Sequence, residues 1–251
     1  MLKELKVLKS HGTQYVKNLR TQSVSGLFRG RPVISGDISK AEINGIAAIC
    51  PVNAIDEKSG SIDIGKCVFC KECSFMLPER ITFTNDYKIA TNDREALIIK
   101  PGIKSPVRFD EGKVRTEIRK LFKCALKLRQ VSAGGDNACE MELAATGNVN
   151  FDFGRFGIEF VASPRHADGI VLTGPITENM EEALRICYDA IPMPKIIILA
   201  GTDAISGGIF IESPALNRKF VDLHHIDLYV PGNPVHPLTF INGVMDLLGI
   251  T

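Results

Sequence analysis

The stretch IGKCVFCKECSFMLP, residues 64–78, decides how the N-terminal part of this 251-residue chain folds. Within it, Cys67, Cys70 and Cys73 are spaced C-x2-C-x2-C. This spacing lets three thiolates from one tight loop bind three corners of a cubane iron–sulfur cluster. A fourth cysteine, Cys50, lies upstream and is followed by proline.

The cysteines that are present, and those that are missing, predict one cluster rather than two. Bacterial ferredoxins contain the run C-x2-C-x2-C-x3-C-P twice, and the fourth cysteine of each run binds the other cluster. Here the first run keeps only its fourth member, Cys50, and has Lys40, Ile43 and Ile46 at its other positions. The second run has Leu77 at its fourth position. The four cysteines therefore form the complete ligand set of one 4Fe–4S cluster, and the ligands of the other cluster are replaced.

A zinc site held by four cysteines is the alternative to iron. Zinc sites usually pair two C-x2-C units, whereas a triplet with a remote Cys-Pro follows the ferredoxin pattern. The surrounding segments CPVNAI, SIDIGKCVFCKEC and LPERITF are typical of the strands and turns of a ferredoxin half-repeat. This part, with FRGRP at Phe28–Pro32, resembles the ferredoxin-like electron-input subunits of complex I and energy-converting hydrogenases. The resemblance implies an α+β ferredoxin-like domain at residues 35–100.

Composition limits the class of protein. The chain is 45% hydrophobic and 24% charged, which is enough to build a core in one large or two small domains. A net charge of +1 gives no overall field that would favour nucleic acid. No apolar run approaches the roughly 18 residues of a membrane-spanning helix, and no secretory signal peptide is recognisable at the start. We therefore expect a cytoplasmic protein, in which Cys124 and Cys187 act as small apolar side chains.

Residues 1–34 are predicted to form a basic arm. They contain seven lysines and arginines against one acidic residue, Glu4. Leu2, Leu5 and Leu8 recur at helical spacing. Such a helix can lie on the anionic cytoplasmic face of a membrane, dock on a partner such as a membrane-arm subunit, or pack on its own domain.

A change in the sequence pattern, to alternating strand-like and helical segments, predicts a second domain at residues 123–251. Residues 101–122 form a Pro- and Gly-containing linker and a short helix at 111–122. Short β-branched runs then alternate with helical patterns, with strands at 156–162, 169–173, 195–200 and 226–230 and helices at 137–145, 178–190 and 237–248. This alternation predicts an α/β domain with a parallel sheet, whose ligand loops gather at the carboxyl ends of the strands.

Five loops that follow the strands carry the motifs SAGGDNACEME, SPRHAD, TGPIT, GTDAISGG and PGNPV. Their order and spacing, over about residues 123–248, resemble the small subunit of energy-converting nickel–iron hydrogenases and its complex I homologue. The resemblance implies a flavodoxin-like sheet and a partner similar to the hydrogenase large subunit, which covers the loops. It also implies a proximal 4Fe–4S cluster held by four cysteines.

Three of those four cysteines are missing, which defines a vestigial proximal site. Asp136 and Cys139 stand where the family has C-x2-C, while Asp203 and Asn233 replace the other two cysteines. Two carboxylates, an amide and one thiolate match no iron–sulfur pattern. The favoured interpretation is that these side chains hydrogen-bond to loop amides. The alternatives are a hard divalent ion such as Mg²⁺ or Mn²⁺, and a nucleotide or flavin, whose phosphate Asp136 would repel.

Together these observations predict a redox subunit with no catalytic centre of its own. Its single 4Fe–4S cluster would relay electrons between a soluble donor or acceptor, such as a ferredoxin-type protein, and a hydrogenase-large-subunit-like partner. The alternative is a structural or regulatory subunit of such a complex, in which the cluster stabilises the fold or senses the redox state.

Overall fold

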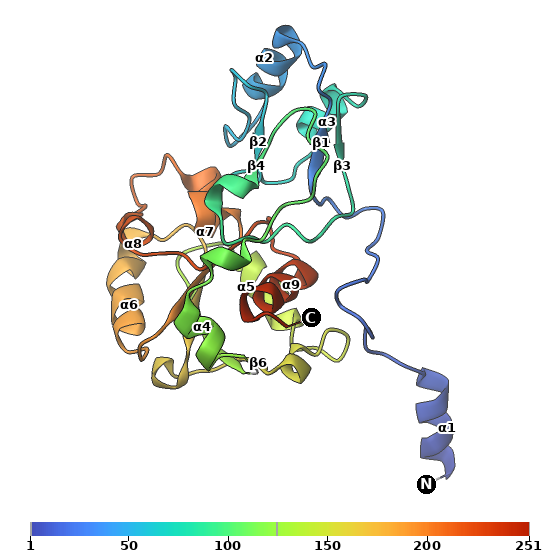
Figure 1. Ribbon diagram of the computed structural model, residues 1–251, viewed down its shortest axis with the longest axis vertical. Helices are drawn as coiled ribbons and strands as arrows, with labels where there is room; N and C mark the ends of the chain where they lie inside the picture. The colour runs from blue at the N-terminus through green and yellow to red at the C-terminus, as the bar shows by residue number, and fades with distance from the viewer. Residues whose placement is uncertain (1, 124, 251) are drawn as a thin grey trace.

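The computed structural model describes residues 2–123 and 125–250, so the expectation for Cys124 falls outside the described residues. An N-terminal helix, a small α+β domain and a larger α/β domain follow one another along the chain (Figure 1). No helix within the described residues is long and apolar enough to cross a membrane.

The larger domain is built on a five-stranded sheet in the order β6-β5-β7-β8-β9. The strands are β5 (Leu126–Ser132), β6 (Ile158–Phe160), β7 (Gly169–Thr173), β8 (Ile196–Ala200) and β9 (Leu228–Val230). All neighbouring pairs are parallel. Numbered along the chain this order is 2-1-3-4-5, that of flavodoxin-like folds. The predicted flavodoxin-like α/β domain is confirmed.

Helices cover both faces of this sheet because its central strands are apolar on both sides. Every residue of β7 and β8 is buried. On one face Ile170 and Ile197 belong to a core with α6 (Glu178–Asp189), α7 (Thr202–Ser206) and α8 (Lys219–Leu223). On the other face Val171 and Ile198 pack with α4 (Thr116–Leu121), α5 (Ala138–Ala145) and α9 (Pro237–Leu248). Short 3-10 turns η3 (Phe153–Phe156) and η5 (Gly208–Phe210) complete the domain.

The helix expected at residues 111–122 is interrupted. The structure has a 3-10 turn, η2 (Glu111–Lys113), and then α4, with Arg115 between them in a non-helical conformation. Arg115 donates to both oxygens of the buried carboxylate of Asp227 at 2.9 and 3.0 Å, and to the carbonyl of Lys195. The ion pair with the buried Asp227 carboxylate therefore holds Arg115 at the break between η2 and α4.

The small domain contains two antiparallel strand pairs, each accompanied by a helix, as the ferredoxin resemblance implies. β1 (Pro32–Ile34) pairs with β3 (Ile81–Phe83), and β2 (Ile62–Asp63) pairs with β4 (Ile98–Ile99). The helices are α2 (Lys40–Ala48) and α3 (Glu72–Met76), and the 3-10 turn η1 (Arg94–Leu97) precedes β4. A capping box between Ser39 and Glu42 begins α2.

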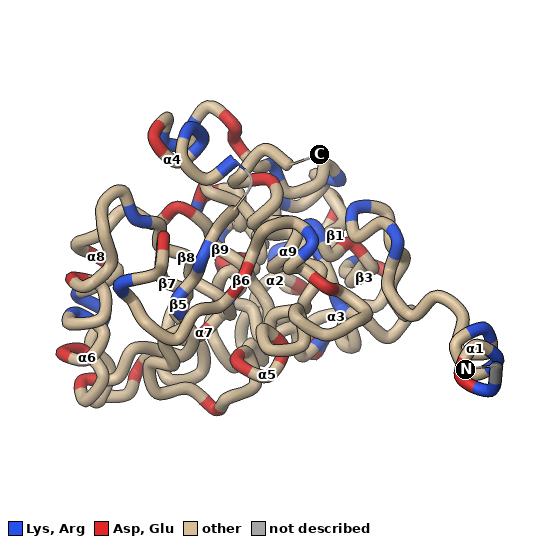
Figure 2. The backbone as a smooth tube through the Cα atoms, turned by 90° about the horizontal axis from the view of Figure 1, so that it is seen from below, with Lys and Arg blue, Asp and Glu red and all other residues tan. Residues whose placement is uncertain are grey.

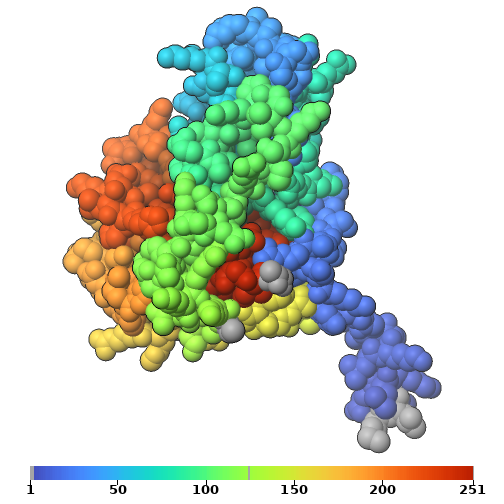
Figure 3. Space-filling model, viewed as in Figure 1, coloured from blue at the N-terminus to red at the C-terminus, as the bar shows by residue number. Residues whose placement is uncertain are grey.

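The basic arm divides into a projecting helix and a docked segment. Helix α1 (Leu2–His11) stands clear of the body (Figure 3), and its Leu5 and Leu8 are 56% and 66% exposed. Basic residues occur along this helix (Figure 2). By contrast, Leu19 is buried, and its carbonyl accepts hydrogen bonds from Tyr87 and Asn242. Residues after α1 therefore join the two domains.

The loop at residues 163–168 lies at the opposite end of the sheet from its expected position. Strand β6 pairs only with the first three residues of β5, so the chain turns back before it reaches the carboxyl end. The amide of Asp168 donates to the carbonyl of Lys127, and the Asp168 carboxylate accepts from the Lys127 amide, at the start of β5. The expectation that this loop joins the others at the carboxyl edge is wrong. It contains the 3-10 turn η4 (Pro164–His166).

Candidate functional site

The loop that carries three of the cysteines is shaped by one aspartate and two left-handed residues. The carbonyl of Asp63 accepts from the amides of Lys66 and Cys67 at 3.0 and 2.9 Å. Its carboxylate is held by Arg94 through two hydrogen bonds of 2.9 and 2.6 Å. Phe69 and Lys71 have φ values of 55° and 71°, which tighten the turn on either side of Cys70.

The structure brings the four predicted ligands together from two segments of the chain. Cys50 follows the end of α2, and Cys67, Cys70 and Cys73 come from the loop and from α3. Cys67 and Cys73 are buried, while Cys50 and Cys70 are partly exposed. Burial first, and the other cysteines in addition, raise the pKa of Cys67 to about 12 and that of Cys73 to about 11. Such thiols ionise at neutral pH only when a metal replaces the proton.

Backbone amides point at two of these sulfurs. The amide of Ala54 donates to Cys50 Sγ and that of Phe69 to Cys67 Sγ, both at 3.3 Å. Hydrogen bonds to ligand sulfurs are one of the ways in which proteins set the reduction potential of an iron–sulfur cluster. Four thiols, two of which accept from backbone amides and two of which are buried, are a donor set that fits a 4Fe–4S cluster.

Zinc is the alternative metal for these four thiols. Around one zinc ion, all four sulfurs must lie about 2.3 Å from a single point. Within residues 2–123 and 125–250, no group of three or more His, Cys, Asp or Glu side chains is already arranged to hold a metal ion. A cubane binds each thiolate to a different iron, so its ligands lie further apart. Cluster binding by these cysteines stays a prediction.

Apolar side chains occupy positions where a second cluster would have its ligands. Ile43 and Ile46 are buried on α2, and Leu77 packs against the same core as Ile46. Lys40, at the remaining position, directs its ammonium group to the carbonyl of Glu57.

The FRGRP segment clamps the cysteine loop, a role that the sequence analysis did not assign. Arg29 donates to the carbonyls of Phe69 and Cys70 at 2.9 and 3.3 Å. Gly30 lies so close to the backbone of Asp86 that a Cβ atom would be 2.1 Å from its carbonyl oxygen. Arg31 is buried and pairs with the Asp86 carboxylate. The sequence feature that could have indicated this role is Arg-Gly-Arg, residues 29–31, directly before strand β1.

The vestigial proximal site gathers three loops at the carboxyl ends of the strands. Asp136 accepts a hydrogen bond of 2.9 Å from the amide of Ala138, at the start of α5, which is the kind of loop contact expected. Cys139 lies against Gly201, where a Cβ atom would be 2.5 Å from its sulfur. Burial first, and the nearby carboxylates in addition, raise the pKa of Cys139 to about 12.

Asp203 does not make the expected contact. Its Oδ1 is buried without a hydrogen-bond partner, and a Cβ atom on Gly208 would be 1.8 Å from it. Burial first, and then Asp136 and Glu140, raise the pKa of this carboxyl to about 6. Asn233, the fourth position, is partly exposed and belongs to the loop after β9.

One threonine links the cysteine loop to the vestigial site. The hydroxyl of Thr202, which is fully buried, lies 2.9 Å from the carbonyl oxygen of Cys67 and 3.1 Å from that of Gly232. The Thr202 amide donates to the same Gly232 carbonyl at 2.9 Å. The Thr202 side chain therefore joins the cysteine loop to the vestigial site across the domain boundary.

Comparison with known proteins adds three findings. The family model described as NADH ubiquinone oxidoreductase, 20 Kd subunit, matches residues 137–247. The chain is 37% identical over 115 residues to a probable membrane-bound hydrogenase subunit of Pyrococcus furiosus, which is 46% of this chain and 69% of that protein. It is 35% identical over 151 residues to formate hydrogenlyase subunit 7 of Escherichia coli, which is 59% of each chain.

Among solved structures, the membrane-bound sulfane sulfur reductase, an archaeal respiratory membrane complex, matches with a TM-score of 0.46 and 24% identity. The match covers 53% of this chain and 74% of that one. The matches to the two curated relatives span 69% and 59% of those relatives' lengths.

Proposed function

Because this chain belongs to the family of the NADH ubiquinone oxidoreductase 20 Kd subunit, we propose that it is an electron-transfer subunit of a hydrogenase-like or complex I-like oxidoreductase complex. It carries one 4Fe–4S cluster on Cys50, Cys67, Cys70 and Cys73. Its vestigial proximal site, made of Asp136, Cys139, Asp203 and Asn233, carries none.

The observation that supports this proposal is the convergence of four thiols that are distant in sequence. Cys50 and the loop at residues 67–73 meet inside the small domain, and their thiols are near enough to raise the pKa of Cys67 and Cys73. When bound there, a 4Fe–4S cluster supplies a site that gains or loses one electron. The amides of Ala54 and Phe69 stabilise the negative charge on two of the sulfurs. Ile64 and Phe69, both buried, help to exclude water.

The partner that we propose is a large subunit of the hydrogenase type, which binds at the carboxyl edge of the sheet. Exposed apolar side chains occur in this region: Met141 on α5, Ile209 in η5 and Ile211 just after it are 67%, 59% and 49% exposed. Large apolar patches of this kind mark interaction sites. A soluble ferredoxin-type protein is the proposed donor or acceptor. Attachment is peripheral, beside a membrane-arm subunit on the cytoplasmic face.

Metal analysis of the full chain, purified without oxygen, tests the cluster assignment. We expect about four iron and four sulfide per chain, as one cubane requires. Changing Cys50, Cys67, Cys70 or Cys73 to Ser should weaken or abolish this content. Cys187→Ser is the matched control, since Cys187 lies partly buried on α6, outside the four-cysteine group.

Three results would contradict the assignment or part of it. About eight iron per chain would refute the single cluster, and one zinc without sulfide would refute iron–sulfur chemistry altogether. A cluster that is present but cannot be reduced and reoxidised reversibly in a potentiometric titration would favour the structural role over electron transfer.

A further inference from the structure

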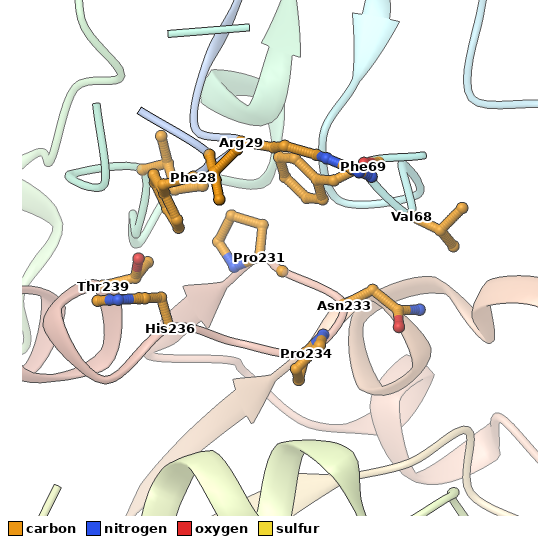
Figure 4. Close-up of a pocket in the computed structure, with 12 residues that line it drawn as sticks. Phe28, Arg29, Val68, Phe69, Pro231, Asn233, Pro234, His236 and Thr239 are labelled. Carbon is orange, nitrogen blue, oxygen red and sulfur yellow. Dashed lines mark hydrogen bonds between the residues drawn. The ribbon is translucent and has the colours of Figure 1, made fainter. Parts of the chain in front are cut away.

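A cavity of about 360 Å³ lies between the two domains, and none of the four cysteines is among the residues that line it (Figure 4). The cysteine loop forms its roof through Val68 and Phe69, and residues 231–234 together with the start of α9 form its floor. Its volume is within the range of small-molecule sites in proteins, which begins at about 300 Å³. The cavity is therefore large enough for a small organic molecule.

One polar group in this cavity has no partner in the protein. Thr239 is 1% exposed, lines the cavity and has a hydroxyl oxygen that makes no hydrogen bond. Leaving a buried hydroxyl unpaired costs free energy, and a side chain of valine would have the same shape without that cost. Such a group in a native protein therefore calls for an explanation, and a bound ligand is one.

The charge of the cavity is positive. Among the described residues that line it, Arg29 is the single side chain with a full charge. The guanidinium of Arg29 is held in place by the carbonyls of Phe69 and Cys70. Burial lowers the pKa of His236, which keeps its ring neutral, and this ring accepts from the amide of Leu238 to cap α9. The cavity therefore favours an anion.

The walls between these polar groups are apolar and partly aromatic. Phe28 and Phe69 lie above Pro231 in Figure 4, and Phe28 meets the ring of His236 edge-on at 5.0 Å and 67°. Aromatic side chains pack well against another ring, face to edge or offset. In the same view Thr239 lies towards one end of the cavity, and the Arg29 guanidinium reaches towards the other.

We propose that this cavity binds a small aromatic carboxylate that carries a second oxygen on its ring. The ring packs among Phe28, Phe69 and Pro231, the carboxylate pairs with Arg29, and the second oxygen bonds to the hydroxyl of Thr239. This site is additional to the proposed electron transfer and does not require it.

Titration calorimetry on the full chain, purified without oxygen, provides the test with three probes. These are 4-hydroxybenzoate, benzoate, which lacks the hydroxyl, and phenol, which lacks the carboxylate. We expect 4-hydroxybenzoate to bind most tightly. Thr239→Val should weaken its binding about fivefold, the worth of one hydrogen bond, and leave benzoate binding unchanged. Arg29→Gln should weaken the binding of the two carboxylates more than the binding of phenol, which has no charge to pair with Arg29.

A second measurement separates ligand binding from folding. Without ligand, Thr239→Val should raise the melting temperature, because it removes an unpaired buried hydroxyl. Thr146→Val is the control: Thr146 is equally buried, but its hydroxyl donates to the carbonyl of Leu143, so this variant should melt lower and bind the probes normally.

The proposal is overturned if 4-hydroxybenzoate releases no heat at millimolar concentration, or if Thr239→Val binds it as the unaltered chain does. It is also overturned if inorganic phosphate competes with 4-hydroxybenzoate as well as benzoate does, because the ring would then contribute nothing. Iron and sulfide are measured in every sample. Loss of the cluster is thereby recorded separately from loss of probe binding.

Discussion

Replacing Asp203 by Asn should stabilise the folded protein above pH 6, and this gain in stability should shrink as the pH falls below 6. Burial, followed by the charges of Asp136 and Glu140, raises the pKa of Asp203 to about 6, against about 3.9 for an unfolded aspartate. Each unit of pKa difference is worth about 1.4 kcal/mol, which sets an upper limit of about 3 kcal/mol. Asp203 is partly exposed, and solvent screening reduces the expected gain to about 1–2 kcal/mol.

The folded state holds the Asp203 proton more tightly than the unfolded state, and this difference decides how stability changes with pH. Between about pH 4 and pH 6 the unfolded chain has lost the Asp203 proton while the folded chain retains it, so the folded state loses stability as the pH rises. Above pH 6 both states are ionised, and the folded state carries a buried carboxylate whose Oδ1 has no partner. The side-chain amide of the Asp203→Asn variant has no such charge, so the difference between the two proteins should grow from pH 4 to pH 6 and then stay constant.

Thermal melting followed by circular dichroism, at one scan rate and several pH values, measures this difference. For a chain of this size, a gain of about 1–2 kcal/mol corresponds to a rise of roughly 3–6 °C. Glu212→Gln is the control, because Glu212 is an exposed carboxylate in the same region of the chain, and we expect little change at any pH. A variant of Asp203 that melts at or below the unaltered protein at pH 7.5 would show that the carboxylate is compensated, and the reasoning would fail.

Two further predictions concern the vestigial site and the partner. Cys139→Ser should leave the iron content and the visible spectrum unchanged, because the other positions of that site hold Asp136, Asp203 and Asn233; loss of iron would mean that Cys139 is a ligand. The chain should copurify with a larger polypeptide from its native source and behave poorly alone, because its exposed apolar edge favours association. A monodisperse monomer near 27.4 kDa in size-exclusion chromatography with light scattering, with no partner recovered, would contradict the subunit assignment.

The elements that sequence reasoning located best are those whose burial is uniform. Strand β7 and helix α9 have the predicted bounds, 169–173 and 237–248. Strand β7 is buried over its whole length, so its apolar run begins and ends with the strand itself. Helix α9 begins at Pro237, and Gly249 follows its last residue in a left-handed conformation. The residues at the two ends of α9 are therefore enough to predict where this helix begins and ends.

The features that sequence reasoning missed depend on pairings between distant segments. The position of the loop at 163–168 follows from β6 pairing with only three residues of β5, and register between strands leaves no local pattern. Arg115, which lies in the break before α4, pairs with Asp227, more than a hundred residues later in the chain. That Asp203 Oδ1 and Thr239 Oγ1 are buried without a hydrogen-bond partner depends on the packing around them, which the sequence does not give.

The carboxylates of the vestigial site would also change the electrostatics of the cluster that we propose on the four cysteines. Asp203 follows Thr202, whose hydroxyl bonds to the backbone of Cys67, so a negative charge develops next to the cysteine loop as the carboxyl ionises. Negative charge nearby disfavours the addition of an electron, and net charge is one of the factors that set iron–sulfur potentials. At this position the chain has a titrating carboxyl with a pKa of about 6. A cluster bound by the four cysteines would therefore have a lower reduction potential above pH 6, where Asp203 is ionised, than below it.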